Sequence, residues 1–263
     1  METAPTPSES TAEAERSRDT THFGYLRVPV EDKEKWVRRH FNTVASRYDF
    51  MNSLLSMGTH HIWKRIAVRM MGLKEGDTVL DVCGGTADLA LLAAGDVAPS
   101  GKIVLYDINW AMMVTGIPKV LDSPHGGRIQ YVQGDAEALA FEDAAFDAAM
   151  VGFGIRNLTR MEEGFREMHR VLRPGGTLMC LEFSQPVTPW FAALYDFYSF
   201  YIMPAVGRVF GGSQPAYTYL PESIRMFPDA EGLKRILEDI GFTGVRYRRL
   251  TDGIAVVHIG VRK

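Results

Sequence analysis

The sequence predicts an α/β protein with a doubly wound, mostly parallel seven-stranded sheet and an antiparallel strand in a C-terminal hairpin. Short apolar runs alternate with helical patterns, which is typical of parallel strands joined by crossover helices. One apolar run, Val79–Val82, ends in the paired glycines Gly84-Gly85 and opens into a helical run. The Asp252-Gly253 pair separates the last two apolar runs and indicates a hairpin, so we expect an antiparallel edge strand.

Residues 1–30 are expected to form a disordered tail, and residues 31–263 a single domain. Up to about Thr20 the chain is rich in Ser, Thr, Glu, Pro and Ala, with scarcely any large apolar side chain. Such a segment cannot bury enough apolar surface to fold. It also lacks the apolar core of a secretory signal, so export is not expected.

Residues 31–75 are predicted to form helices that pack over the sheet or its carboxyl edge. Four residues fall on one face of the first helix, at i, i+4, i+7 and i+11: Val37, Phe41, Val44 and Tyr48. A second helical run follows from His60. The polar residues embedded here are either caps or parts of a lid, with capping favoured: Tyr48, Asp49, Asn52 and His60.

Seven strands are expected, near residues 78–82, 102–107, 129–133, 146–151, 177–183, 244–250 and 254–261. The helix from Met161 to Leu172 has Thr159 and Glu162 as a predicted capping box. A last helix is predicted to begin after Asp229 and to end at Gly241.

Residues 185–227 interrupt this alternation with an aromatic helical insertion. The run from Trp190 to Phe210 has about the length of a membrane span, but Asp196, Pro204 and Arg208 argue against one. It is either a core-packing helix or the wall of a pocket for a large apolar ligand. The polar and aromatic residues that follow are placed to close over a site: Tyr217, Tyr219, Glu222, Ser223 and Arg225.

Composition excludes several classes of protein. The formal net charge of −3 gives no general attraction for nucleic acid. Two cysteines, Cys83 and Cys180, are too few for a disulfide framework or a cysteine-based zinc site, and no metal is expected. We therefore expect a cytoplasmic protein.

The glycine turn predicts a ligand site, because glycines let backbone approach a ligand and free helix N–H groups favour an anion. Neither the third glycine of a dinucleotide fingerprint nor the lysine of a phosphate-binding loop follows Gly84-Gly85. Asp81 can hold a cationic amine beside the anion. An amine and a carboxylate together indicate an amino-acid moiety, and the methionine part of S-adenosylmethionine fits better than a pyrophosphate. The alternative is a plain turn without a ligand.

Acidic residues end the next two predicted strands. Asp107, followed by Ile108, lies where an acid accepts hydrogen bonds from ribose hydroxyls in nucleotide-binding sheets. Asp135, followed by Ala136, ends the third strand, where a carboxylate can meet the exocyclic amine of adenine. Helix capping is the alternative for both acids.

The chain resembles the ubiquinone/menaquinone biosynthesis C-methyltransferases (the UbiE/MenG family) from about Phe41 to its C-terminus. Two stretches match family signatures: Tyr48-Asp49-Phe50-Met51-Asn52 with Leu55-Ser56, His60 and Trp63, and Arg170–Gly176 through Leu181–Ser184. Gly152–Asn157 and Glu222–Met226 are similar to two further family segments. The resemblance implies the Rossmann-like fold of class I methyltransferases and the transfer of a methyl group from S-adenosylmethionine to a ring carbon of a polyprenylated hydroquinone.

By this resemblance, Thr86, Asp107, Asp135 and Ala136 contact the cofactor. The chain departs from the family at two positions of the predicted site. Ala87 stands where the family has glycine, and Gly152 stands where many relatives have serine, so that a side-chain contact there is lost or taken by backbone.

Five residues are candidates for the chemistry. Arg156 and Asn157 are expected to position the quinol oxygen and stabilise its phenolate, and Tyr48, Asp49 and His60 are candidates for the proton path. Guanidinium stays charged, so Arg156 is not expected to take the proton directly.

The aromatic insertion is the expected wall for the isoprenoid tail, and its apolar surface suits peripheral contact with the inner face of a membrane. We expect demethylmenaquinol as substrate, with a benzoquinol as the alternative. A homo-oligomer is among the expected assemblies. Three other functions stay open: an O- or N-methyltransferase for a soluble molecule, a non-catalytic binding protein, and an NAD-linked oxidoreductase.

Overall fold

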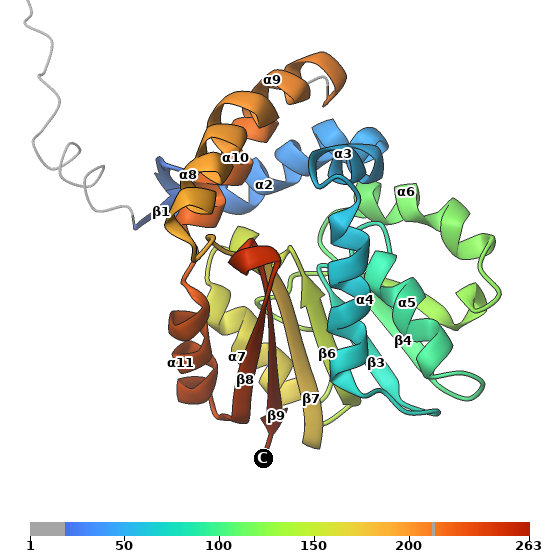
Figure 1. Cartoon of the computed structure of the whole chain (residues 1–263). Coiled ribbons are helices and arrows are strands. Elements are labelled where there is room, and N and C mark those ends of the chain that lie inside the picture. The colour runs from blue at the N-terminus through green and yellow to red at the C-terminus, as the bar shows by residue number, and fades with distance from the viewer. Residues whose placement is uncertain (1–18, 212–213) are drawn as a thin grey trace, which may run out of the picture.

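The computed structural model of the chain describes residues 19–211 and 214–263, and its centre is a sheet with strand order β5-β4-β3-β6-β7-β9-β8 (Figure 1). The strands are β3 (Thr78–Val82), β4 (Lys102–Asp107), β5 (Ile129–Gln133), β6 (Phe146–Gly152), β7 (Leu172–Phe183), β8 (Phe242–Leu250) and β9 (Ala255–Arg262). The strands from β5 to β7 pair in parallel. The seven predicted strands are confirmed.

The C-terminal hairpin and its antiparallel pairing are confirmed, and the structure adds which of its two strands lies at the edge. β9 is antiparallel to both of its neighbours and lies between β7 and β8, so the edge strand is β8. The physical reason is burial, because β9 is buried almost throughout its length. β8 exposes Arg246, Arg248 and Arg249, which suit an edge that meets water.

Helices cover both faces of the sheet. On one face lie α4 (Thr59–Met71), α5 (Asp88–Asp96) and α6 (Trp110–Leu121), and their apolar side chains share a core with alternate residues of the central strands. On the other face, α7 (Met161–Val171) and α11 (Ala230–Ile240) form a second core. α11 is capped by Asp229 and ends at Gly241, as predicted.

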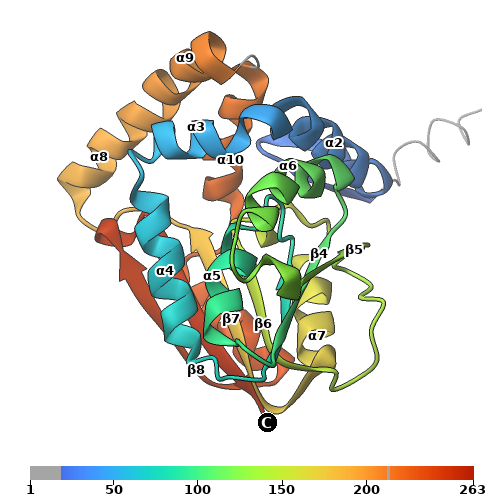
Figure 2. The ribbon, with the colours of Figure 1, turned by 90° about the vertical axis from the view of Figure 1, so that its right-hand side faces the viewer.

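A layer of helices lies over the carboxyl ends of the parallel strands (Figures 1 and 2). It contains α2 (Val30–Val44), η1 (Ala45–Arg47), α3 (Tyr48–Leu55), α8 (Pro189–Phe197), η4 (Tyr198–Ile202), α9 (Met203–Val206), η5 (Gly207–Gly211) and α10 (Gln214–Met226). A third, smaller core joins α3 to α9 and α10 through Met51, Leu55, Met203 and Tyr217. The N-terminal helices and the aromatic insertion, far apart in sequence, therefore form one cap.

The predicted tail is too long. Residues 20–29 form a hairpin of β1 (Thr20–Phe23) and β2 (Leu26–Pro29), so the prediction of disorder is wrong there, and residues 1–18 lie outside the described residues. Tertiary contacts hold the hairpin. Phe23 stacks on Tyr219 at 4.1 Å between ring centroids, and Glu222 accepts a hydrogen bond from the Tyr25 amide.

The predicted capping box of α7 is also wrong. Arg160 is the N-cap residue and makes no side-chain cap bond. Instead, the Glu137 carboxylate accepts hydrogen bonds from the Thr159 and Arg160 amides at 2.6 and 2.9 Å. A residue distant in sequence thus satisfies the amides at the start of this helix.

Candidate active site

The glycine turn between β3 and α5 has left-handed backbone at residues that are not glycine. Cys83 and Ala87 have φ angles of 55° and 70°, and Gly85 has 51°. A left-handed conformation costs a residue with a Cβ roughly 1–2 kcal/mol. The turn at Ala87 therefore carries backbone strain.

Asp81 lies behind this turn and not in a cavity. Its side chain is fully buried, and Oδ2 accepts a hydrogen bond from the Ala90 amide at 3.0 Å. Burial raises the pKa of Asp81 to about 8. The carboxyl group supports the start of α5 through Oδ2, whereas Oδ1 has no hydrogen-bond partner among the described residues, and the expected contact with a cationic amine stays a prediction.

A cavity of about 270 Å³ opens beside the turn, and we call it the first cavity. Six of the residues predicted to bind the cofactor line it: Gly85, Asp107, Ile108, Asp135, Ala136 and Gly152. The Asp107 carboxylate accepts hydrogen bonds from the Gly85 amide at 2.9 Å and the Asn109 amide at 2.7 Å. Burial raises the pKa of Asp107 to about 6, against these two hydrogen bonds.

The far wall of the first cavity comes from the cap and was missed by the sequence reasoning. Arg38 and Phe41 of α2 line it, and Asn109 donates to Asn42 at 2.9 Å, which ties α2 to the start of α6. The helical stripe through Phe41 and Tyr48 was the available signal. That stripe predicted a helix face packed against the protein, and in the structure the same face borders the first cavity.

A second cavity of about 430 Å³ lies between the cap and the sheet, and its lining is mostly apolar. Helices α2, α3, α8 and α10 contribute to it, with Phe191, Leu194, Tyr195 and Tyr198 from the aromatic insertion. Of the two readings of the insertion, the structure therefore favours the wall of a pocket.

The two cavities adjoin, because Phe41, Tyr48 and Phe153 line both of them. The two neighbouring candidate catalytic residues lie on different sides of this junction, because Asn157 lines the first cavity and Arg156 lines the second. The Tyr219 hydroxyl donates to Asn157 Oδ1 at 2.9 Å, which links the two sides. Burial raises the pKa of Tyr48, so its phenol stays protonated at neutral pH.

Arg156 is buried and paired with Glu182. Its Nη1 donates to both Glu182 oxygens, at 3.1 and 2.9 Å, and to the Phe153 carbonyl at 2.6 Å. Burial alone would lower the pKa of Arg156, but Glu182 outweighs it and the pKa is raised. Within the described part of the chain Nη2 forms no hydrogen bond, so its N–H groups are available to an oxygen in the second cavity.

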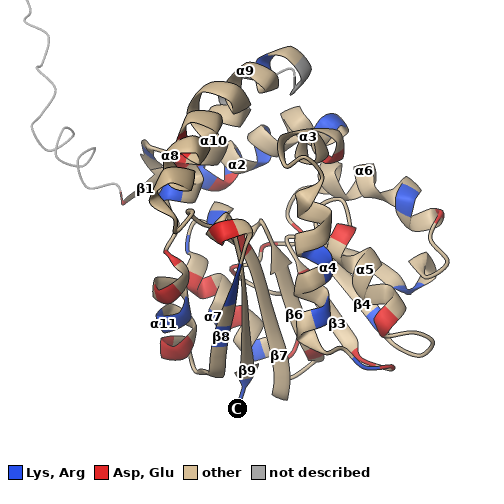
Figure 3. Ribbon diagram, viewed as in Figure 1, with Lys and Arg blue, Asp and Glu red and all other residues tan. Residues whose placement is uncertain are grey.

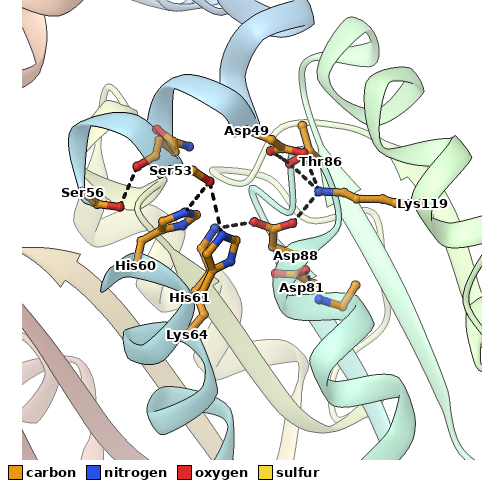
Figure 4. A network of polar contacts seen from close by, with 12 residues as sticks. Asp49, Ser53, Ser56, His60, His61, Lys64, Asp81, Thr86, Asp88 and Lys119 are labelled. Atoms are coloured by element: carbon orange, nitrogen blue, oxygen red, sulfur yellow. Dashed lines mark hydrogen bonds and ion pairs between the residues drawn. The ribbon is translucent and has the colours of Figure 1, made fainter. Parts of the chain in front are cut away.

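His60 lines the second cavity, and its Nε2 lies 3.2 Å from Ser53 Oγ. Burial, and then the charge of Lys64, lowers the pKa of His60 to about 4, so the imidazole is neutral at physiological pH. Asp49, Gly84 and Thr86 line neither cavity. Asp49 and Thr86 instead meet in a polar network below α3 (Figure 4).

The residues of the first cavity fit the cofactor expected from the sequence. A Cβ at Gly134 would lie 2.0 Å from the Tyr106 hydroxyl, so only glycine fits at the position before Asp135 without moving Tyr106. Each Asp107 oxygen accepts one amide in the turn and can accept further bonds from ribose hydroxyls. Asp135 Oδ1 accepts from the Glu137 amide at 2.9 Å, which leaves Oδ2 for an amine.

Curated proteins of known sequence are similar along almost the whole chain. The chain is 47% identical over 245 residues to the ubiquinone/menaquinone biosynthesis C-methyltransferase UbiE of Hahella chejuensis, covering 93% of this chain and 98% of that protein. It is 45% identical over 249 residues to the protein of the same name from Ectopseudomonas mendocina, covering 95% and 97%.

Solved structures of low sequence identity share the fold. A SAM-dependent methyltransferase from Aquifex aeolicus matches with a TM-score of 0.54 and 18% identity, covering 76% of this chain and 89% of that one. Phosphoethanolamine N-methyltransferase 2 of Haemonchus contortus, in complex with S-adenosylmethionine, matches with a TM-score of 0.56 and 14% identity, covering 76% and 52%. Both matches identify the fold as that of class I methyltransferases.

The model of the ubiE/COQ5 methyltransferase family matches residues 29–262, which is nearly all of the described structure. The glycine turn, the acid at the end of β4 and the adjoining cavities lie within this match. The chain therefore belongs to the ubiE/COQ5 methyltransferase family and is an S-adenosylmethionine-dependent methyltransferase.

Proposed function

We propose that this chain methylates a ring carbon of a polyprenylated hydroquinone, and that its substrate is demethylmenaquinol. The observation that carries the proposal is the junction of the two cavities at Phe41, Tyr48 and Phe153. The first cavity, which has the more polar lining of the two and suits the cofactor, meets there a larger and mostly apolar cavity that suits a prenylated ring. The names of the curated relatives supply the substrate class.

The first cavity holds the cofactor in this proposal. Asp107 accepts from the ribose hydroxyls, Asp135 and Ala136 face the adenine, and Gly85 and Gly152 bring backbone close. Asp81, Gly84 and Thr86 act from behind by shaping the turn. When bound, S-adenosylmethionine supplies an electrophilic methyl group, and the protein must aim the acceptor carbon at it along the line of the C–S bond.

Arg156 and Asn157 position the acceptor ring. The free Nη2 of Arg156 donates to the quinol oxygen beside the reacting carbon, and this donation stabilises negative charge on that oxygen. Asn157 is held by Tyr219 and Gly154, so it fixes the turn that carries Arg156. Tyr48 packs at the junction and excludes water there.

The quinol proton must leave as the ring carbon gains the methyl group. A phenol pKa is near 10 and the pKa of His60 is about 4, so complete transfer before methylation would cost about 8 kcal/mol. We infer that His60 accepts the hydroxyl proton while the new carbon–carbon bond forms and the methyl group leaves sulfur. The hydrogen on the methylated ring carbon then leaves as a proton and the ring oxygen takes a proton back, so one proton is released overall. Asp49, which points to Lys119, is a positioning residue in this proposal.

A second part of the proposal is peripheral contact with a membrane, where a polyprenylated quinol dissolves. Helix α8 and the η4 turn after it expose Trp190, Leu194, Phe197 and Tyr201, and Leu194 and Phe197 also border the second cavity. Asp196 is the one charged residue from Pro189 to Val206, and these helices are largely uncharged in Figure 3. None of the helices in the described part of the chain combines the length and apolar character that crossing a bilayer requires.

The experiment is a turnover assay with the purified chain, S-adenosylmethionine and three acceptors. The acceptors are a prenylated naphthoquinol, a prenylated methoxybenzoquinol and a soluble dihydroxynaphthalene. Formation of S-adenosylhomocysteine and of the C-methylated naphthoquinol supports the proposal. Methylation of the benzoquinol alone would contradict demethylmenaquinol as the substrate and assign a benzoquinol instead. O-methylation of the soluble compound would overturn the whole proposal.

A further inference from the structure

A chain of alternating charges joins the cap to the glycine turn (Figure 4). Lys119 Nζ lies 2.7 Å from Asp49 Oδ2 and also contacts Asp88 Oδ1. Asp88 Oδ2 in turn lies 2.6 Å from Lys64 Nζ. Thr86 Oγ1 donates to Asp49 Oδ1 at 2.6 Å. The network thus links helices α3, α4, α5 and α6.

The Lys64–Asp88 pair is better shielded than an ordinary surface pair, whereas the Asp49 side chain that pairs with Lys119 is 41% exposed. The side chains of Lys64 and Asp88 are 9% and 22% exposed, and that of Lys119 is 30% exposed. Burial alone would raise the pKa of Asp88, but Lys64 and Lys119 outweigh it and hold the pKa well below its usual range. Shielding from water strengthens such attractions.

Both ends of the network lead to the cavities. Asp49 directly follows Tyr48, which lines both cavities, and Lys64 lines the second cavity one turn after His60. Lys119 itself lines neither cavity. It reaches three acceptors on three segments, Asp49, Thr86 and Asp88, which matches the three N–H groups of an ammonium.

We propose that Lys119 is a positioning residue that couples occupancy of the first cavity to closure of α3 over the second. It holds Asp49, and hence Tyr48, against the turn that faces the cofactor. This inference rests on the proposed function. Without Lys119, Asp88 keeps Lys64 as a partner, whereas Asp49 loses its cation. The start of α5 therefore stays held while α3 is released, and quinol binding and turnover suffer more than cofactor binding.

The test compares Lys119→Met, Lys119→Arg and the wild type, with Lys74→Met as a matched control at an exposed lysine. Calorimetry measures the affinity for S-adenosylhomocysteine with and without a short-chain prenyl naphthoquinone, and turnover gives kcat and KM. In the wild type we expect the quinone to tighten S-adenosylhomocysteine binding. Lys119→Met should abolish this enhancement and lower kcat by about tenfold or more. Lys119→Arg should restore most of both, and Lys74→Met should change neither.

A second variant covers the case in which Lys119→Met does not fold. Asp49→Asn removes the same ion pair with an isosteric side chain and should give the same losses, and the double variant should be no worse than either single one. Independent binding of the two ligands in the wild type, or retained enhancement and kcat in both single variants, overturns the inference. A wild type that binds S-adenosylhomocysteine but methylates no quinol contradicts the proposed function instead.

Discussion

Arg156 Nη1 donates to both carboxylate oxygens of Glu182, at 3.1 and 2.9 Å, beneath the junction of the two cavities. Both side chains are more than nine-tenths buried. Glu182 neutralises most of the charge on Arg156, so Arg156 acts as a directed donor and not as a free cation. The ion pair therefore has a structural role, and Arg156 has in addition a proposed catalytic role. Variants of the two residues can separate these roles.

Arg156→Ala should destabilise the protein and abolish turnover together. Removing one partner of a buried ion pair leaves the other charge unpaired, which costs about 3–5 kcal/mol. Replacing both residues, as Arg156→Met with Glu182→Met, should restore most of the stability because no charge remains buried. Turnover should stay lost in the double variant. Denaturant unfolding and the methylation assay measure the two effects, and normal turnover in the double variant would remove Arg156 from the mechanism.

Affinity for S-adenosylhomocysteine should fall as the pH falls through about 6. The pKa of Asp107 is raised to about 6 by burial, and a protonated carboxyl accepts ribose hydroxyls less well than a carboxylate. The neighbouring Asp81, whose pKa is raised to about 8, is mostly uncharged below that pH and does not reverse this direction. Calorimetry between about pH 5 and pH 8 measures the effect. Asp107→Asn should bind more weakly and show no such pH dependence, and a flat wild-type profile would contradict the assignment.

The same group should affect stability in the opposite direction. The folded pKa of Asp107, about 6, lies above its ordinary value of 3.8, so the folded protein binds this proton more readily than the unfolded chain does. The stabilisation from this group is fully present below the ordinary value and is lost as the pH rises through about 6. The free energy of unfolding of Asp107→Asn, relative to wild type, should therefore rise from the acidic end to neutral pH, on top of a loss at every pH because asparagine keeps one acceptor for the Gly85 and Asn109 amides. Denaturant unfolding at several pH values, relative to wild type, checks the sign.

Ala87→Gly should leave stability nearly unchanged, within about 0.5 kcal/mol, although Ala87 is fully buried. Relief of the left-handed strain at a φ of 70° offsets the lost methyl burial and the added freedom of the unfolded chain. The matched variant is Ala90→Gly, at a position that is equally buried but helical. It should cost about 1–2 kcal/mol, because no strain is relieved there. Equal losses in the two variants would show that the turn is unstrained.

Replacing exposed apolar residues of α8 should weaken binding to vesicles. Trp190 and Phe197 are 70% and 54% exposed, and burying such a side chain in lipid is worth about 1.5–3 kcal/mol. Trp190→Glu with Phe197→Glu should therefore reduce flotation with phosphatidylcholine vesicles by about tenfold or more. Leu121→Glu on α6, at an equally exposed apolar position, is the control and should float like the wild type. Absence of flotation by the wild type would contradict the proposed membrane contact.

Much of the central sheet could be predicted because its signals are local. The apolar runs at 78–82 and 102–107 coincide with β3 and β4, since strands covered on both faces need continuous apolar residues. Asp107 was placed beside the glycine turn from its position in the chain, and it bonds to Gly85. Because the carboxyl ends of parallel strands meet at one edge of the sheet, residues at those ends converge without further information.

Contacts between distant segments were beyond such reasoning. Asp81 has the same sequence context whether it faces a ligand or supports Ala90, and only packing places it behind the turn. Asp49 belongs to a family signature, yet its partners Lys119 and Thr86 lie far away in the chain. The hairpin at residues 20–29 depends on Tyr219 and Glu222, so its own sequence carries little sign of it.

The sequence by itself determined the order of strands and helices, the glycine turn and the acids that end β4 and β5, because periodicity and turn chemistry act over a few residues. Only the tertiary structure decided that Arg156 and Asn157 face different cavities, that β9 lies inside the sheet, and that Lys119 joins three segments. Those features depend on where side chains from distant segments meet. Such meetings are selected by close packing and by the pairing of buried charges, and neither leaves a local pattern in the chain.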